Sequence, residues 1–247
     1  MGIFSQREKN YALVTIIILS FVFGFNDKSE IFDVNHWLIN FLLTVIAVSI
    51  SFLLSYIAIK KAAEKIGCET EYGIWSFSRF GFEPHQKAKF MKKEFAFPIG
   101  IILPLIITLL SNGLWYLPVI GKNILVEKGR QGKIFSKLTG YERTLIYLAG
   151  PLTNLVLFFL FLFLSRFGID FGIFISVNMW MALFGLLPLP NLNGAEMLFG
   201  SLAMYLFALF FTVMSILLAP ISIVFAILLA LIVASTIVVV YFFKISS

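Results

Sequence analysis

Long apolar segments recur along almost the whole chain, and they constrain its fold more than any single motif does. A helix of about 20 apolar residues is long enough to cross the hydrocarbon core of a bilayer, and several windows reach that length. Hydrophobic residues make up 60% of the 247 positions and charged residues only 13%. A water-soluble domain of this size could not bury so much apolar surface. The sequence therefore predicts an integral, multi-pass membrane protein.

Six segments are expected to span the membrane as helices. The final apolar block is too long for one crossing, and Pro220 marks the place where it turns back. The predicted spans are residues 11–25, 36–59, 143–164, 171–189, 202–219 and 221–243. The expected fold class is thus an all-α polytopic membrane protein with one membrane domain, residues 1–247. That domain comprises an N-terminal span and external loop (1–35), a core (36–200) and a C-terminal helical hairpin (201–247).

Residues 95–117 are apolar but are interrupted by proline and glycine, among them Pro98, Pro104 and Gly113. Broken backbone in contact with lipid is costly. Most of the lysines and arginines lie just before or just after this segment, and basic loops favour the cytoplasmic side. We therefore expect a re-entrant or interfacial hairpin with a small extended region beside it, and both chain termini in the cytoplasm.

The net charge of +6 is explained without nucleic acid. Cytoplasmic loops of membrane proteins are basic, and lysines close to span ends, such as Lys60 and Lys93, are attracted to anionic lipid. The expected partners therefore include the lipid bilayer and no nucleic acid. The single cysteine, Cys68, excludes an intrachain disulfide framework.

Two segments carry recognisable motifs. Residues 143–154 read RTLIYLAGPLTN, and residues 184–196 read FGLLPLPNLNGAE. Gly150 and Pro151 suit the start of a helix, and Asn154 would place a polar group inside a membrane helix. In this order and at this separation, the two segments resemble the A-G-P-x-x-N and L-D-G motifs of site-2 proteases, a family of intramembrane zinc metalloproteases. The resemblance covers roughly residues 50–200 and implies a site-2-protease-like core.

Members of that family bind zinc through an H-E-x-x-H motif on one helix and the aspartate of L-D-G. Histidines four residues apart share a helix face, and the glutamate serves as general base. Residues 60–75, KKAAEKIGCETEYGIW, resemble the sequence that follows the first motif. The resemblance then places Ser55 and Ile59 at the two histidine positions, Tyr56 at the general base and Asn193 at the aspartate.

All three zinc ligands and the general base are therefore replaced. Catalytic zinc usually takes three protein ligands from Cys, His or carboxylate side chains, so we expect no zinc cofactor and no catalytic residue. His36 and His85 are isolated and cannot supply the motif. A metal held by Glu196 and Asn193 with Cys68 stays open as an alternative.

Polar and helix-breaking residues still gather around the second motif, where members of the family hold an extended substrate segment. Buried polar groups in a membrane tend to be functional or to pair across helices. The residues concerned are Asn154, Asn178, Pro188, Pro190, Asn191, Asn193, Gly194 and Glu196. We interpret them as a groove for a transmembrane segment of a partner protein. In a plainer interpretation, Asn and Gly let the helix end at the cytoplasmic surface.

Three functional hypotheses follow. The first is a catalytically inactive protein of the site-2 protease type, a pseudoprotease that binds transmembrane segments or partner membrane proteins. The alternative is an active intramembrane metalloprotease with displaced ligands or with activity supplied by a partner. A transporter or channel is less well supported, because residues 202–243 offer only Ser, Thr and Tyr as polar groups.

Overall fold

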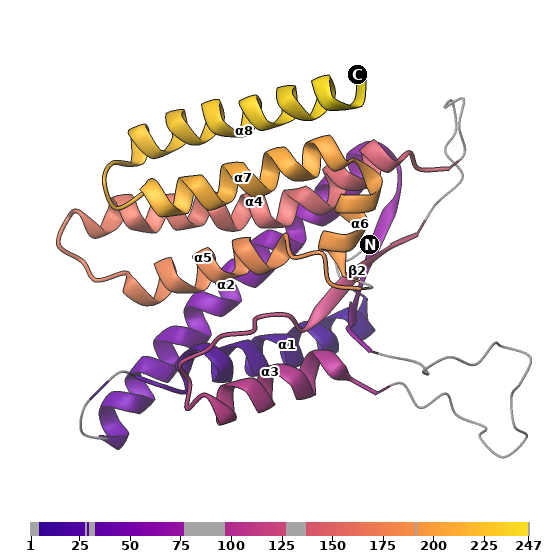
Figure 1. Cartoon of the computed structure of the whole chain (residues 1–247). Helices are drawn as coiled ribbons and strands as arrows, with labels where there is room; N and C mark the ends of the chain where they lie inside the picture. The colour runs from indigo at the N-terminus through magenta and orange to yellow at the C-terminus, as the bar shows by residue number, and fades with distance from the viewer. Residues whose placement is uncertain are drawn as a thin grey trace, which may run out of the picture.

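The computed structural model describes residues 5–27, 29, 33–76, 97–126, 137–190 and 192–246. In these ranges the chain forms eight helices and one two-stranded sheet (Figure 1). The helices are α1 (Gln6–Gly24), α2 (Val34–Ile66), α3 (Ile99–Leu110), α4 (Gly140–Ser165), α5 (Gly172–Gly185), α6 (Asn193–Gly200), α7 (Leu202–Leu218) and α8 (Ile223–Ser246). The strands are β1 (Glu69–Ile74) and β2 (Gly121–Val126).

Three of the described helices, α2, α4 and α8, are long and apolar enough to cross a membrane. Helices α3, α5 and α7 are also apolar but have 10–17 residues, fewer than the about 20 that a full crossing takes. The chain is therefore mostly helical and has the composition of a membrane protein. The number of six spans stays a prediction.

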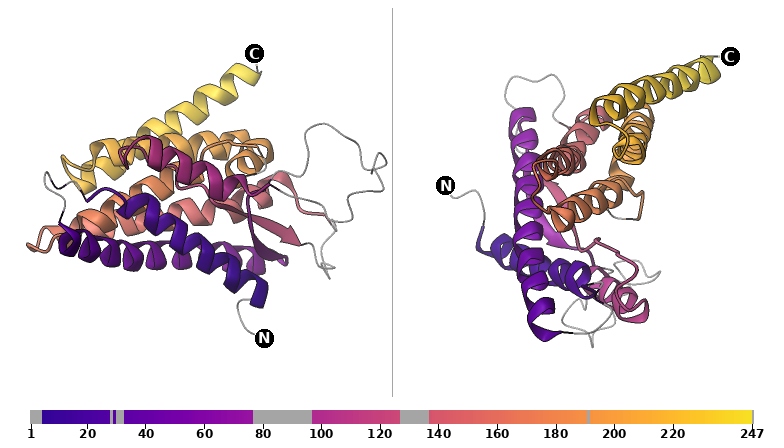
Figure 2. Two further views of the ribbon diagram at one scale, coloured as in Figure 1. Left: turned by 90° about the horizontal axis from the view of Figure 1, so that it is seen from below. Right: turned by 90° about the vertical axis from the view of Figure 1, so that its left-hand side faces the viewer.

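Successive helices run back and forth between two ends of the molecule, and the sheet lies at one of these ends (Figure 1). Helix α2 contacts α1 as well as α4 and α5, and Figure 2 shows α1 and α3 together, away from α7 and α8. The start of α1 and the end of α8 both lie at the end that carries the sheet (Figure 1). This arrangement agrees with two termini on one side of a membrane, and which side they occupy stays a prediction.

Helix α2 is longer than the span expected at residues 36–59. It starts after Asp33, whose carboxylate accepts a hydrogen bond from the Asn35 N–H, and it ends at Gly67 in the left-handed conformation. The additional turns at its C-terminal end are polar, so they continue the helix beyond the apolar segment. Because the helix reaches Ile66, the positions expected for the first zinc motif lie inside it rather than at its end.

The segment expected to form a hairpin, 95–117, goes out as α3 and returns as extended chain; its first two residues lie outside the described part. Both ends of the excursion bond to Trp75: the Gly100 N–H donates to the Trp75 carbonyl at 2.9 Å, and the Trp75 N–H donates to the Ile120 carbonyl at 2.9 Å. The turn at the tip has Gly113 at φ 72°. The excursion therefore starts and finishes at one place, which is the geometry of a hairpin rather than of a single crossing.

The expectation of an all-α chain needs a correction, because β1 and β2 form an antiparallel sheet. Glu69 pairs with Val126 at one end of the register, and Ile74 pairs with Gly121 at the other. β1 directly follows α2, and β2 directly follows the hairpin. The sheet thus joins two segments far apart in the sequence and places Asn123, opposite Tyr72, near the C-terminal part of α2.

Pro151 was expected at a helix start, and this expectation is wrong. Helix α4 begins eleven residues earlier at Gly140, where Thr139 and Glu142 form a capping box that satisfies free backbone N–H groups. Pro151 therefore lies inside α4. Its ring packs on α5, where a Cβ added to Gly185 would be 2.9 Å from the ring. The lack of a side chain at Gly185 therefore leaves room for the Pro151 ring where α4 contacts α5.

The C-terminal part forms the predicted helical hairpin. Helices α7 and α8 are joined by a turn that contains Pro220. Ala226, Ala230 and Ala234 are fully buried on α8, and their spacing of four residues places them on one face. Since α8 packs chiefly on α7, these small residues bring the two helices close together. Figure 2 shows α8 at the outer edge of the molecule.

Candidate functional site

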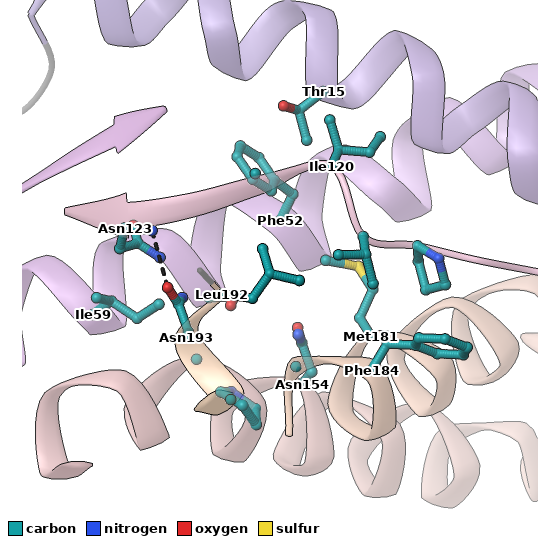
Figure 3. Close-up of a pocket in the computed structure, with 18 of the residues that line it drawn as sticks. Thr15, Phe52, Ile59, Ile120, Asn123, Asn154, Met181, Phe184, Leu192 and Asn193 are labelled. Carbon is teal, nitrogen blue, oxygen red and sulfur yellow. Dashed lines mark hydrogen bonds between the residues drawn. The ribbon is translucent and has the colours of Figure 1, made fainter. Parts of the chain in front are cut away.

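A cavity lies where α1, α2, α4, α5, the start of α6 and the chain before β2 approach one another (Figure 3). We call it the central cavity; its volume is about 110 Å³. Its lining includes residues from both sequence motifs and from the chain that follows the hairpin. They are Thr15, Leu19, Phe52, Ser55, Ile59, Tyr72, Pro118, Val119, Ile120, Gly121, Asn123, Gly150, Pro151, Asn154, Met181, Phe184, Gly185, Leu192, Asn193 and Gly194.

Of the four positions that the resemblance assigns to the zinc ligands and the general base, three line this cavity. Ser55 and Ile59 lie one helical turn apart on α2, as residues i and i+4 do, and Asn193 enters from the start of α6. Gly150 of α4 lies against the first two: a Cβ there would be 2.8 Å from Ile59 Cδ1 and 3.1 Å from Ser55 Oγ. A glycine therefore permits the close approach of α4 to this face of α2.

Asn193 is bound to the sheet. Its side-chain oxygen accepts a hydrogen bond of 3.0 Å from the backbone N–H of Asn123 (Figure 3). The carbonyl of Asn123 accepts a second bond, of 3.0 Å, from the hydroxyl of Tyr147 on α4. Both backbone groups of Asn123 thus bond to side chains, on the edge of β2 that faces away from β1. These side chains are Asn193 and Tyr147.

Tyr56, at the fourth position, is not among the residues that line the cavity. Its hydroxyl donates a hydrogen bond to the carboxylate of Glu8 on α1. The same carboxylate accepts from Lys60 Nζ at 3.1 Å and from the Tyr72 N–H at 3.3 Å. The position of the general base is thus occupied by a residue that fastens α1 to α2 and β1.

Burial of Glu8 raises the pKa of its carboxyl group, but hydrogen bonds from Tyr56, from the Ser5 backbone and from Lys60 outweigh burial and lower the pKa to about 2. Sequence reasoning missed this residue. Ser5 and Glu8 show the capping-box spacing, which marks a helix start but gives no sign that the carboxylate is buried. The burial of the Glu8 carboxylate depends on the residues of α2 and β1 that pack around it.

Three members of the predicted groove, Asn154, Asn193 and Gly194, line the central cavity. Asn154 is 3% exposed, and its side-chain oxygen has no hydrogen-bond partner among the described residues. At Gly194 a Cβ would lie 2.1 Å from the carbonyl oxygen of Leu187. A side chain at position 194 would therefore push α6 away from the chain that follows α5.

The other members of the predicted groove are placed elsewhere. Asn178 is fully buried inside α5, where its amide donates to the Phe174 carbonyl at 2.8 Å, and it does not line the cavity. Pro188 and Pro190 are exposed in the link between α5 and α6. Asn191 lies outside the described residues.

Glu196 lines a second cavity of about 260 Å³, which shares Asn123, Leu192 and Asn193 with the central cavity. Its carboxylate forms an ion pair with Arg143 of α4 at 2.9 Å. Three residues thus form a wall between the two cavities, and Glu196 lies behind that wall. Its charge is already paired with a guanidinium group.

The side chains of the central cavity do not fit a catalytic zinc ion. Its described lining offers amide and hydroxyl oxygens but no histidine, cysteine or carboxylate, which are the ligands that zinc takes. No group of three such residues comes together anywhere in the described part of the chain. Cys68 is buried beside Ala63 and Ile146 and is not among the residues that line either cavity, whereas Asn193 and Glu196 both line the second one.

Comparison with known proteins gives a relative of the expected kind. The chain is similar to a protein of Methanocaldococcus jannaschii whose name assigns it provisionally as a zinc metalloprotease. The two are 27% identical over 202 residues, which cover 79% of this chain and 85% of the relative. No protein-family model matches the chain, and no solved structure matches it significantly. The similarity is consistent with a metalloprotease family.

Proposed function

We propose that this protein is a multi-pass, catalytically inactive member of the site-2 protease type that holds a transmembrane segment of a partner membrane protein. The observation that carries the proposal is the central cavity. Ser55, Ile59 and Asn193, the positions that the resemblance assigns to three zinc ligands, line one cavity. A core that holds these positions together but replaces all three ligands supports binding in place of hydrolysis.

The rest of the site supports the same proposal. The Tyr56 hydroxyl is bonded to Glu8 and Tyr56 does not line the cavity, so the position that the resemblance assigns to the general base supplies none there. Asn193 uses its oxygen to bind the Asn123 N–H. An active enzyme with displaced ligands would need another metal-binding group, and Glu196, which lines the adjoining cavity, is paired with Arg143.

Zinc content tests the loss of metal chemistry. We expect the full-length protein, purified in detergent without chelators, to contain far less than one zinc per chain by elemental analysis, even after incubation with zinc and gel filtration. One zinc per chain, retained through gel filtration, would favour the alternative of an active metalloprotease and would overturn the proposal.

Photo-crosslinking in native membranes tests the binding of a partner. Phe184 lines the central cavity, so replacing it by benzoylphenylalanine keeps an aromatic ring at the site. Phe163 of α4 is 51% exposed and lies outside the cavity lining, which makes it the matched control. We expect crosslinks from position 184, absent from 163, that map by mass spectrometry to transmembrane segments of other proteins. Identical products from both positions, or none from position 184, would contradict the proposal.

A further inference from the structure

An open apolar groove lies between α1 and α2, on the outside of the molecule. Its volume is about 300 Å³, and we call it the α1–α2 groove. Leu13 and Ile17 of α1 line it and are 59% and 55% exposed, so the groove faces outwards. It shares no residue with the central cavity. The lining residues are Lys9, Ala12, Leu13, Ile16, Ile17 and Leu53.

One residue of this lining is charged. Lys9 is exposed, and no ion pair joins it to another described residue. The adjacent acid, Glu8, does not neutralise it, because the Glu8 carboxylate is bound to Tyr56 and Lys60. The positive charge of Lys9 is therefore available to a ligand in the groove.

The charge and the apolar side chains follow one line along α1. Lys9, Leu13 and Ile16 are spaced by four and three residues, and such spacings place side chains on one face of a helix. Helix α1 starts at the end of the molecule that carries the sheet (Figure 1), so Lys9 lies towards that end and the apolar part runs away from it. A ligand that follows this line is anionic at one end and apolar along the rest.

The length of the groove distinguishes an acyl chain from a helix. From Lys9 to Ile17 helix α1 rises about 12 Å, at 1.5 Å per residue. The hydrocarbon core of a bilayer is roughly 30 Å thick, so one leaflet accounts for about 15 Å. A transmembrane helix of a partner or of a second copy needs the full thickness, whereas the acyl chain of a phospholipid occupies one leaflet. The α1–α2 groove therefore matches an acyl chain.

We propose that the α1–α2 groove binds an anionic phospholipid. The acyl chain lies against Leu13, Ile17 and Leu53, and the ammonium group of Lys9 pairs with the phosphate of the headgroup. Lysine side chains extend to the membrane surface while their stems stay on apolar surface, and basic pockets between membrane helices bind anionic headgroups. A zwitterionic lipid brings its own cation to the phosphate, so Lys9 favours a lipid of net negative charge. The site is separate from the central cavity, and this inference goes beyond the proposed function.

The test uses the full-length protein in phosphatidylcholine nanodiscs that contain a small share of a lipid with a diazirine in its acyl chain. The labelled lipid is either phosphatidylglycerol or phosphatidylcholine, and mass spectrometry gives the ratio of labelling by the two at each residue. Val240 of α8 is the matched reference, because it is 59% exposed like Leu13 and precedes Lys244 by four residues, yet lies outside the groove. We expect the ratio at Leu13 to be at least threefold higher than at Val240.

The variant Lys9→Gln removes the cation and keeps the apolar groove. It should lower the labelling of Leu13 by phosphatidylglycerol about fivefold, the effect of one lysine near an anionic surface, and leave the labelling by phosphatidylcholine unchanged. Arg7→Gln is the control, because Arg7 is also an exposed cation of α1 but does not line the groove. It should keep the preference for phosphatidylglycerol. The comparison of Leu13 with Val240 needs no variant.

Each contrary result identifies another state of the groove. Equal ratios at Leu13 and Val240 would show that the groove meets only the surrounding bilayer, and they would overturn the inference. Labelling of Val240 without labelling of Leu13 would show that a protein segment covers the groove, which would also overturn it. Equal losses in Lys9→Gln and Arg7→Gln would assign the preference to the general positive charge of this end of α1, again against the inference. None of these results bears on the crosslinks expected from position 184, so the proposed function is tested separately.

Discussion

The side-chain oxygen of Asn193 accepts a hydrogen bond of 3.0 Å from the backbone N–H of Asn123. Asn193 stands where the resemblance to site-2 proteases places a metal-binding aspartate, yet this oxygen binds the sheet. Since Tyr147 bonds the carbonyl of the same residue, one residue of β2 is fixed to both α4 and α6. The wall between the two cavities is built on these contacts.

Removing the acceptor at position 193 should destabilise the protein. Asn193→Ala leaves the Asn123 N–H without its partner, and we expect a loss of about 1 kcal/mol in unfolding free energy. Asn193→Asp keeps an oxygen at the same place and should retain most of the stability. Unfolding of the two variants in detergent measures the difference. Equal losses in both would mean that this hydrogen bond does not hold the wall.

Zinc-binding side chains at positions 55, 59 and 193 should create a zinc site only when all three are present. Ser55 and Ile59 share a helix face and line the same cavity as Asn193, so His at 55 and 59 with Asp at 193 would present three ligands that zinc accepts. We expect the triple variant to bind one zinc per chain and Asn193→Asp alone to bind none, measured by elemental analysis. A triple variant that folds but binds no zinc would show that the three positions do not converge as ligands.

Acidification should weaken the attachment of α1. The pKa of Glu8 lies at about 2, below the usual 4.5, so the contribution of its carboxylate is complete above about pH 4.5 and is lost as the pH falls towards 2. The stability of Glu8→Gln should therefore be lower than that of the wild type at neutral pH, and the gap should narrow below pH 4.5. The exposed Glu64→Gln provides the control in the same unfolding measurements.

A methyl group at position 100 should disrupt the hairpin. A Cβ on Gly100 would lie 2.1 Å from the carbonyl oxygen of Ile120, so Gly100→Ala forces the outgoing and returning chains apart, at a cost of about 1–3 kcal/mol. At Gly73 a Cβ would make only an ordinary contact of 3.7 Å with Ile124. Gly73→Ala is therefore expected to be much milder. Limited proteolysis of both variants compares the exposure of residues 97–126.

Several elements could be predicted because their signals are local. Long apolar segments indicate helices wherever they lie, and α2, α4 and α8 follow from them directly. The helix predicted at residues 143–164 corresponds to α4, whose additional first turn starts at the capping box of Thr139 and Glu142. The sheet was missed because pairing between β1 and β2 joins residues such as Tyr72 and Asn123, and a six-residue strand carries too weak a pattern to show its partner.

The site was predictable to the extent that motif positions are fixed by spacing. The resemblance of residues 60–75 to the sequence after the first motif assigned Ser55 and Ile59, and the second motif assigned Asn193; all three line the central cavity. Asn123 could not be found in this way, because its contact with Asn193 joins residues 70 positions apart. Tyr56 lies next to Ser55 on α2, but its hydroxyl donates a hydrogen bond to Glu8 of α1.

By itself, the sequence determined that this chain is built from apolar helices, that a segment containing several glycines and prolines interrupts them, and that no H-E-x-x-H motif occurs in it. These properties depend on residue type and short spacing. Only the tertiary structure decided that the replaced positions surround one cavity, that Asn193 bonds to β2, and that the oxygen of Asn154 is buried without a donor. Those properties depend on which helices and strands pack together. Such contacts join residues far apart in the sequence, so no short motif specifies them.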